Sequence, residues 1–300
     1  MRQALVLTGA VAALAGGGWQ ASAPLPVART EVAAALDGNR IVVAGGYLAD
    51  GSTTARVDLF DPLQGTWRTG PGLPRPLNHA SAATLGGNAV VVGGYAGPGN
   101  PTTSAYRLAG NAWRRIAPLP RRRAAAAAAT LGGRLYVVGG VTDGGLARSL
   151  LEYDPAKNRW RQLPGPTPRQ HLAAAAAGGR LYAIAGRIAG ADTNVDTVES
   201  WAPGERRWRP EHSVPEARSG TGAAAIGNLV VSIGSESPQG TSGAAYALDV
   251  RTGDWRPLPD LPTPRHGLGV VAFRGDVLAI GGGPQPGLTV TGANERLTFP

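Results

Sequence analysis

Cysteine is absent from the 300 residues. A disulfide framework, a cysteine-ligated metal and a cysteine nucleophile are therefore excluded. Charged side chains are also few, at 16%, and aromatic ones make up only 6%. Beyond the amino terminus, no stretch approaches the ~18 apolar residues that a membrane-spanning helix needs, so we expect no membrane span.

Glycine and proline, in contrast, are abundant, with 45 and 25 residues. Their combined share stays below the roughly 25–30% at which low-complexity disorder becomes the better explanation. Short runs of valine, leucine and isoleucine separate the turn residues, and such runs are typical of strands. The composition therefore predicts a folded, mainly β protein.

The formal charge of +9 comes almost entirely from arginine, because Lys157 is the single lysine. An excess of this size favours acidic partners without naming one. We do not expect nucleic acid, since the sequence offers no helix for a groove and no basic run beyond Arg121-Arg122-Arg123.

The amino terminus has the layout of a secretory signal. Arg2 precedes an apolar, alanine-rich run from Ala4 to Ala15 that is too short to span a bilayer. The small residues before Ala15 and before Ala23 are typical of signal-peptide cleavage sites, so cleavage could follow either alanine. We expect a signal peptide over residues 1–15 and export to the periplasm or the extracellular space.

Six repeats of just under 50 residues run through the rest of the chain. Each contains a β-branched run that ends in a pair of small residues, and these pairs begin at residues 45, 93, 139, 185, 234 and 281. A tryptophan recurs with the same period, at Trp19, Trp67, Trp113, Trp160, Trp208 and Trp255. Within each repeat, hairpin turns and alternating patterns predict four short strands. Four-stranded units repeated in this way make a β-propeller.

The alanine-rich segments would be helical if judged by propensity alone. Ala124–Ala129 is the clearest example. We predict strands there, because the equivalent segments of other repeats contain glycine, threonine and valine, and because strands crowded around a central axis need small side chains.

The paired glycines, followed at fixed distances by an aromatic residue and a tryptophan, resemble the kelch family. The resemblance covers the chain from Trp19 to the carboxyl terminus and implies an all-β, six-bladed propeller with four antiparallel strands per blade. The Gly-His and Trp-Asp signature of WD-type propellers is absent. We expect one domain over residues 16–300, without a cofactor, as a monomer.

The two ends of the chain complement each other. The sixth repeat stops at Pro300 without a tryptophan-bearing strand, whereas Trp19 has no preceding strands. We therefore expect the strand around Trp19 to complete the last blade and close the ring, which also pairs edges that would otherwise be exposed. Cleavage after Ala23 would remove this strand, which favours cleavage after Ala15.

The alternation of strands divides the connections between two faces. Tight turns share one face, and the longer connections share the other, which we call the long-loop face. Loops on a rigid scaffold commonly carry binding residues. The long connections are expected at residues 47–54, 95–104, 141–149, 187–196, 236–243 and 283–294.

Five repeats place an arginine where the innermost strand begins, sixteen residues before the small-residue pair. The resemblance to kelch propellers implies that such arginines contact acidic ligands, and a guanidinium fork suits a carboxylate, sulfate or phosphate. Structural ion pairing is the alternative. The predicted ligand-binding residues are Arg29, Arg123, Arg169, Arg218 and Arg265.

Two residues further on, Glu31, His79 and His171 occupy equivalent positions and could converge on the axis. They are candidates for a general acid and base, or for a site with two histidines and one carboxylate as metal ligands. Water-bridged polar residues lining the channel are the third possibility. We assign no metal from the sequence, and His212 and His266 have no predicted role.

Two functions follow from these expectations. The first is an exported, non-catalytic binding module for an anionic small molecule, an acidic glycan or an acidic protein segment. The alternative is a sugar-modifying enzyme, because exported six-bladed kelch propellers include sialic acid mutarotases, to which this chain is similar in blade number and secretion. Galactose-oxidase-like copper chemistry is excluded, because its cofactor requires a Cys-Tyr crosslink and this chain has no cysteine.

Export makes a first prediction. Protein secreted by a bacterial host that expresses residues 1–300 should have the intact mass of Gly16 to Pro300, with a formal charge one unit lower after the loss of Arg2. A mass corresponding to Pro24 as the first residue would contradict the closure of the ring by Trp19.

Overall fold

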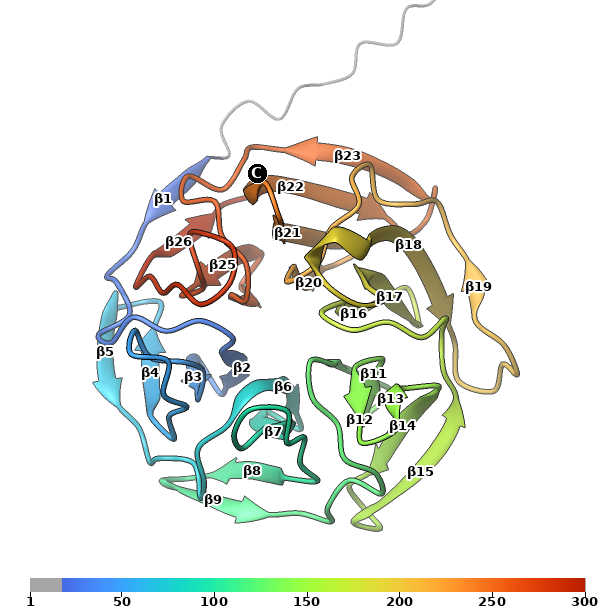
Figure 1. Ribbon diagram of the computed structural model, residues 1–300, viewed down its shortest axis with the longest axis horizontal. Coiled ribbons are helices and arrows are strands. Elements are labelled where there is room, and N and C mark those ends of the chain that lie inside the picture. The colour runs from blue at the N-terminus through green and yellow to red at the C-terminus, as the bar shows by residue number, and fades with distance from the viewer. Residues whose placement is uncertain (1–17, 300) are drawn as a thin grey trace, which may run out of the picture.

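The computed structural model describes residues 18–299. They form six four-stranded antiparallel sheets arranged around a central axis, as expected (Figure 1). The predicted signal peptide, residues 1–15, lies outside the described residues. Only one short helical segment occurs among residues 18–299, the 3-10 turn η1 (Ala191–Thr193). Accordingly, this part of the chain contains no helix able to cross a membrane.

The first three blades follow one another in sequence, each with its first strand innermost. Blade 1 consists of β2 (Ala33–Asp37), β3 (Arg40–Ala44), β4 (Val57–Asp61) and β5 (Thr66–Thr69). Blade 2 consists of β6 (Asn78–Leu85), β7 (Asn88–Tyr95), β8 (Ala105–Ala109) and β9 (Ala112–Arg115). Blade 3 consists of β10 (Ala127–Leu131), β11 (Arg134–Val138), β14 (Ser149–Asp154) and β15 (Arg159–Pro164). A small hairpin in its long loop pairs β12 (Val141–Thr142) with β13 (Gly145–Leu146).

The last three blades repeat the pattern. Blade 4 consists of β16 (Ala173–Ala177), β17 (Arg180–Arg187), β18 (Asn194–Trp201) and β19 (Arg209–Pro210). Blade 5 consists of β20 (Gly222–Ile226), β21 (Leu229–Ser237), β22 (Gly240–Asp249) and β23 (Asp254–Leu258). Blade 6 consists of β24 (Gly269–Phe273), β25 (Asp276–Ile280), β26 (Asn294–Leu297) and β1 (Trp19–Ala21).

Strand β1 closes the ring, which confirms the expectation for Trp19. It pairs antiparallel with β26, and Trp19 lies opposite Leu297 (Figure 1). Without β1, the outer edge of β26 would be unpaired and open to association with another chain.

The recurring tryptophans bind each blade to the preceding one. In all six blades the indole N–H donates to a backbone carbonyl in the segment that leaves the preceding blade, at 2.7–3.0 Å. The ring-closing Trp19 donates to Pro259 in the same way as Trp67 donates to Ala23. Buried Val, Leu, Ile and Ala side chains fill the space between adjacent sheets.

The alanine-rich segments are strands, as predicted, and they line the axis. Strand β10 begins at Ala127, three residues later than the start of the predicted segment, because Ala125 has a φ of +49° and leaves the strand conformation. Methyl side chains allow the six inner strands to lie close to the axis, because larger side chains would clash in the limited space there.

The paired small residues let neighbouring blades approach closely. The N–H of Gly94 donates to the carbonyl of Arg123 in the next blade at 2.8 Å, and the preceding Gly93 has a φ of +67°. A Cβ atom on Gly93 would lie 2.3 Å from that same carbonyl oxygen. Glycine is required at position 93 both because a side chain would clash with the neighbouring blade and because the backbone is left-handed.

The substitution Gly93→Ala should therefore lower the free energy of unfolding by about 2–4 kcal/mol, because it adds a steric clash to an unfavourable φ. Gly99→Ala is the matched control, since Gly99 has a φ of +62° but no atom within 4 Å of an added Cβ. It should lose only about 1 kcal/mol. Equal losses in urea-induced unfolding would show that contact between blades is not the constraint.

Candidate functional site

A ring of six equivalent residues surrounds the axis where the innermost strands begin. Every member has a left-handed backbone conformation, with φ between +49° and +63°. Five of their N–H groups each donate to the carbonyl of the preceding member, at 2.9–3.1 Å, and Val32 completes the circle by donating to Gly267 at 3.4 Å. The ring residues are Glu31, His79, Ala125, His171, Gly220 and Gly267.

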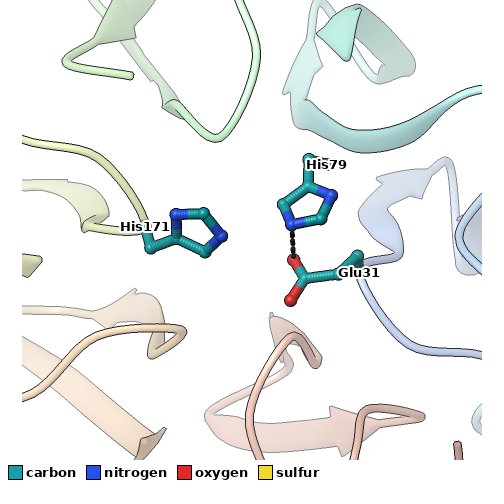
Figure 2. A group of neighbouring side chains, drawn as sticks. All are labelled: Glu31, His79 and His171. Carbon is teal, nitrogen blue, oxygen red and sulfur yellow. Dashed lines mark ion pairs between the residues drawn. The ribbon is translucent and has the colours of Figure 1, made fainter. Parts of the chain in front are cut away.

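This ring brings together the three residues singled out in the sequence. Glu31, His79 and His171 come from blades 1, 2 and 4, and their side chains point toward the axis (Figure 2). Glu31 Oε2 lies 3.3 Å from His79 Nε2, and the two imidazole rings pack edge to face with centroids 4.9 Å apart. The side chains of Glu31 and His79 retain 13% and 14% exposure, so the cluster is accessible at one end.

The Glu31 carboxylate also contacts a histidine for which the sequence predicts no role. His266 places Nδ1 3.4 Å from Glu31 Oε1, and its Nε2 lies 3.6 Å from Glu236 Oε2. Burial opposes ionisation of Glu31, but the neighbouring imidazoles of His79 and His266 outweigh it and hold the pKa of this carboxyl below its ordinary value. Burial also opposes protonation of His266, but Glu31 and Glu236 outweigh it and raise the pKa of His266.

The other two histidines behave differently. Burial lowers the pKa of His79, and the Glu31 carboxylate offsets only part of this effect. Burial and the neighbouring His79 lower the pKa of His171 well below its usual value. The His171 imidazole is therefore neutral near pH 7, beside an ionised carboxylate.

A pocket of about 160 Å³ opens above the cluster on the long-loop face. Its wall includes Arg187 and Glu236, which form an ion pair at 2.6 Å between Arg187 Nη1 and Glu236 Oε1. Tyr47 and Leu288 complete the rim, and Leu288 is 48% exposed. The pocket thus combines charges of both signs, hydroxyl groups and one apolar side chain.

Sequence reasoning missed Arg187, Glu236 and His266. Arg187 and Glu236 could have been found from the repeats, because both directly follow a small-residue pair. The residue at this position forms a β-bridge with a residue just before the innermost strand of its blade. Tyr47 bridges to Thr30 in this way, and Glu236 bridges to Ser219. His266 occupies the strand-entry position of blade 6, one residue before the ring.

The five predicted arginines do not reach the channel surface, which corrects their expected placement. Each is at most 1% exposed and lies within its own blade. Four of them donate to the carbonyl of the first residue of the small-residue pair, sixteen residues further on. The residues concerned are Arg29, Arg123, Arg169, Arg218 and Arg265.

Carboxylates also pair with four of these arginines. Arg29 contacts Asp58 at 2.6 Å, and Arg218 contacts Glu216 at 2.9 Å. Arg169 pairs with Glu199, and Arg265 with Glu295. Arg123 instead contacts the backbone carbonyl and the hydroxyl of Ser149. The Nε atoms of Arg29, Arg123 and Arg218 have no partner among the described residues, but the remaining guanidinium contacts hold all five arginines in place as structural clamps.

Comparison with known proteins agrees with this architecture. Residues 17–186, more than half of the chain, match the family described as KLHDC2/KLHL20/DRC7 Kelch-repeats domain. The chain belongs to the kelch-repeat family. A solved kelch-like fold, titled "Structure of YjhT", superposes with a TM-score of 0.78 over 91% of this chain and 95% of that one. At 16% identity this similarity shows the fold alone, and no curated protein matches the sequence.

The structural role of the buried arginines is testable in Arg265→Met. This change removes the donors of Arg265 from the Glu295 carboxylate and from three backbone carbonyls, so it should cost about 3–5 kcal/mol of unfolding free energy. Arg256→Met, on the exposed outer strand, should change stability by no more than about 0.5 kcal/mol. An Arg265→Met protein with unchanged stability would contradict the clamp.

Proposed function

We propose that this kelch propeller is an exported binding module that takes a small carboxylate-bearing ligand into the pocket on its long-loop face. An acidic sugar or the acidic end of a protein segment would fit this description. Kelch propellers generally act as interaction modules, and the signal-like segment over residues 1–15 supports export. The observation that carries the proposal is the position of Arg187 in the pocket wall.

Arg187 has donors to spare. Its Nη1 is engaged by Glu236 and by Ser219 Oγ, at 2.6 and 3.5 Å. Within residues 18–299, no acceptor pairs with its Nη2, which is not among the fully buried atoms. A guanidinium can bind two carboxylates through different edges, because it carries five N–H groups in a fixed plane. Arg187 can therefore keep Glu236 and bind a ligand carboxylate as well.

The remaining groups suit the polar parts of such a ligand. Glu31 and Glu236 can accept hydrogen bonds from hydroxyl groups, and the Tyr47 hydroxyl can donate or accept. The volume of about 160 Å³ lies below the roughly 300–1,000 Å³ of pockets for drug-sized ligands. The pocket therefore suits one sugar residue or a chain end, with the rest of the ligand outside.

The contact between Glu31 and His79 favours a second candidate function. A carboxylate 3.3 Å from an imidazole, at the floor of a pocket, is the arrangement that proton transfer to and from a sugar would use. A sugar mutarotase or related epimerase needs little more than this, because ring opening requires an acid and a base at the anomeric centre.

Binding is tested by titrating the purified chain with N-acetylneuraminate and galacturonate, with galactose as the uncharged comparison, by calorimetry at low salt. We expect the acidic sugars to bind, and Arg187→Gln to weaken them by about 10- to 100-fold, because a hydrogen bond between charged groups contributes roughly 1.5–3 kcal/mol. Arg187→Lys should recover part of the affinity.

Arg122→Gln is the matched control, because Arg122 is exposed and contacts the long loop at Asn100 and Pro101, outside the pocket lining. Equal losses in both arginine variants would indicate nonspecific charge attraction and contradict the proposal.

NMR of the same mixtures separates the two functions. Accelerated exchange between anomers, abolished in Glu31→Gln, would make the protein an enzyme, whereas binding without exchange supports the module.

A further inference from the structure

Three potential metal ligands from three blades meet on the channel axis. One ligand atom each from Glu31, His79 and His171 can be chosen so that all lie within 4.8 Å of one another (Figure 2). The three residues are far apart in the sequence, and the backbone ring fixes their positions. Their convergence is thus a property of the fold rather than of a flexible loop.

The hydrogen bonds of Asn78 fix the orientation of the His79 ring. Asn78 donates through its side-chain amide to Thr53 Oγ1 at 2.7 Å, which turns its carbonyl oxygen toward His79 Nδ1, also at 2.7 Å. His79 Nδ1 therefore carries the proton. Its Nε2 faces the Glu31 carboxylate at 3.3 Å, so a cation on the axis could contact both atoms.

His171 adds a second imidazole without a compensating contact. Its Nδ1 is buried and has no hydrogen-bond partner among the described residues. A buried polar atom left unpaired is costly, and a bound ion or water molecule removes that cost. His171 thus has a buried, unpaired ring nitrogen in the same cluster as Glu31 and His79.

We propose that Glu31, His79 and His171 bind a divalent transition-metal ion on the channel axis. Two imidazole nitrogens and one carboxylate form a donor set that Zn²⁺ and Fe²⁺ use in proteins, with further positions left for water or a ligand. The open positions would face the pocket above the cluster. Asn78 would orient His79 through Nδ1, as hydrogen-bond partners of metal-bound histidines do.

The ring residues line a cavity of about 100 Å³, with Glu31, His79 and His171 in its wall. Gly267 places no side chain in this cavity, and a Cβ atom there would lie 2.6 Å from Glu31 Oε1. Four-coordinate zinc with bonds of about 2.0–2.1 Å places its ligand atoms roughly 3.3 Å apart. The Glu31–His79 distance already matches this value, and all three ligand atoms lie within 4.8 Å of one another.

This inference does not rest on the proposed function, which depends on Arg187 rather than on the cluster. Protein without an affinity tag is dialysed against EDTA and then titrated with Zn²⁺ by calorimetry, with metal content measured after gel filtration. We expect one ion per chain. His79→Ala and His171→Ala should each weaken binding by about 100-fold or more, since loss of even an orienting partner costs roughly 10- to 100-fold.

His212→Asn is the control, because His212 lies outside the cluster and contacts only Gly253 through its ring. Glu31→Gln keeps the shape of the side chain and the hydrogen-bonded backbone ring but removes the negative charge. It therefore tests whether metal binding needs the carboxylate charge. Near-UV circular dichroism verifies that each variant is folded. Co²⁺ gives an independent measurement, since visible absorption reports nitrogen and oxygen ligands in a low-coordinate site.

Loss of the Co²⁺ spectrum and of stoichiometric Zn²⁺ binding in folded His171→Ala and Glu31→Gln, with both retained in His212→Asn, would support the site. No stoichiometric binding by the unaltered chain would overturn it. Binding that survives His79→Ala and His171→Ala would also overturn it, because the ion would then lie elsewhere. Sugar binding through Arg187 is measured separately, so either proposal can fail alone.

Discussion

The hydrogen-bonded ring at the start of the innermost strands is the constraint on which the rest of the structure depends. Each blade donates to the one before it, and each bond requires a left-handed backbone at the ring position. This conformation costs roughly 1–2 kcal/mol at a residue other than glycine. Gly220 and Gly267 avoid the cost, whereas Glu31, His79, Ala125 and His171 bear it. Three of these four residues are the ones whose side chains converge, and backbone strain of this kind is common at functional sites.

The buried arginines and the paired small residues form a second, mutually dependent arrangement. The side chain of Arg123 binds the carbonyl of Gly139 within its blade, while its own carbonyl accepts the N–H of Gly94 from the blade before. One residue thus holds a long loop and a blade interface together. Burial lowers the pKa of Arg123 to about 10, so the guanidinium stays charged at neutral pH. Five of the arginines that make the sequence basic therefore serve the fold.

The fold could be predicted from the sequence because its signals are periodic, and periodicity survives substitution at single positions. The repeat register also predicted that Glu31, His79 and His171 share a position. The burial of Arg265 could not be predicted, because its partners, Gly281 and Glu295, are brought close only by the blade. His266 was missed for a related reason: it lies one residue outside the register that aligned the other candidates, yet the curvature of the strand entry turns its ring toward Glu31.

The six equivalent blades differ from one another at the mouth of the channel. Blade 3 contributes Ala124, Ala125 and Val141, which carry no polar side chain. The imidazoles, carboxylates and Arg187 belong to the other blades. A bound ligand would therefore meet charged groups on one side and methyl groups on the other, which fixes its orientation about the axis. Six-fold symmetry alone could position a ligand on the axis, but only this asymmetry can orient one.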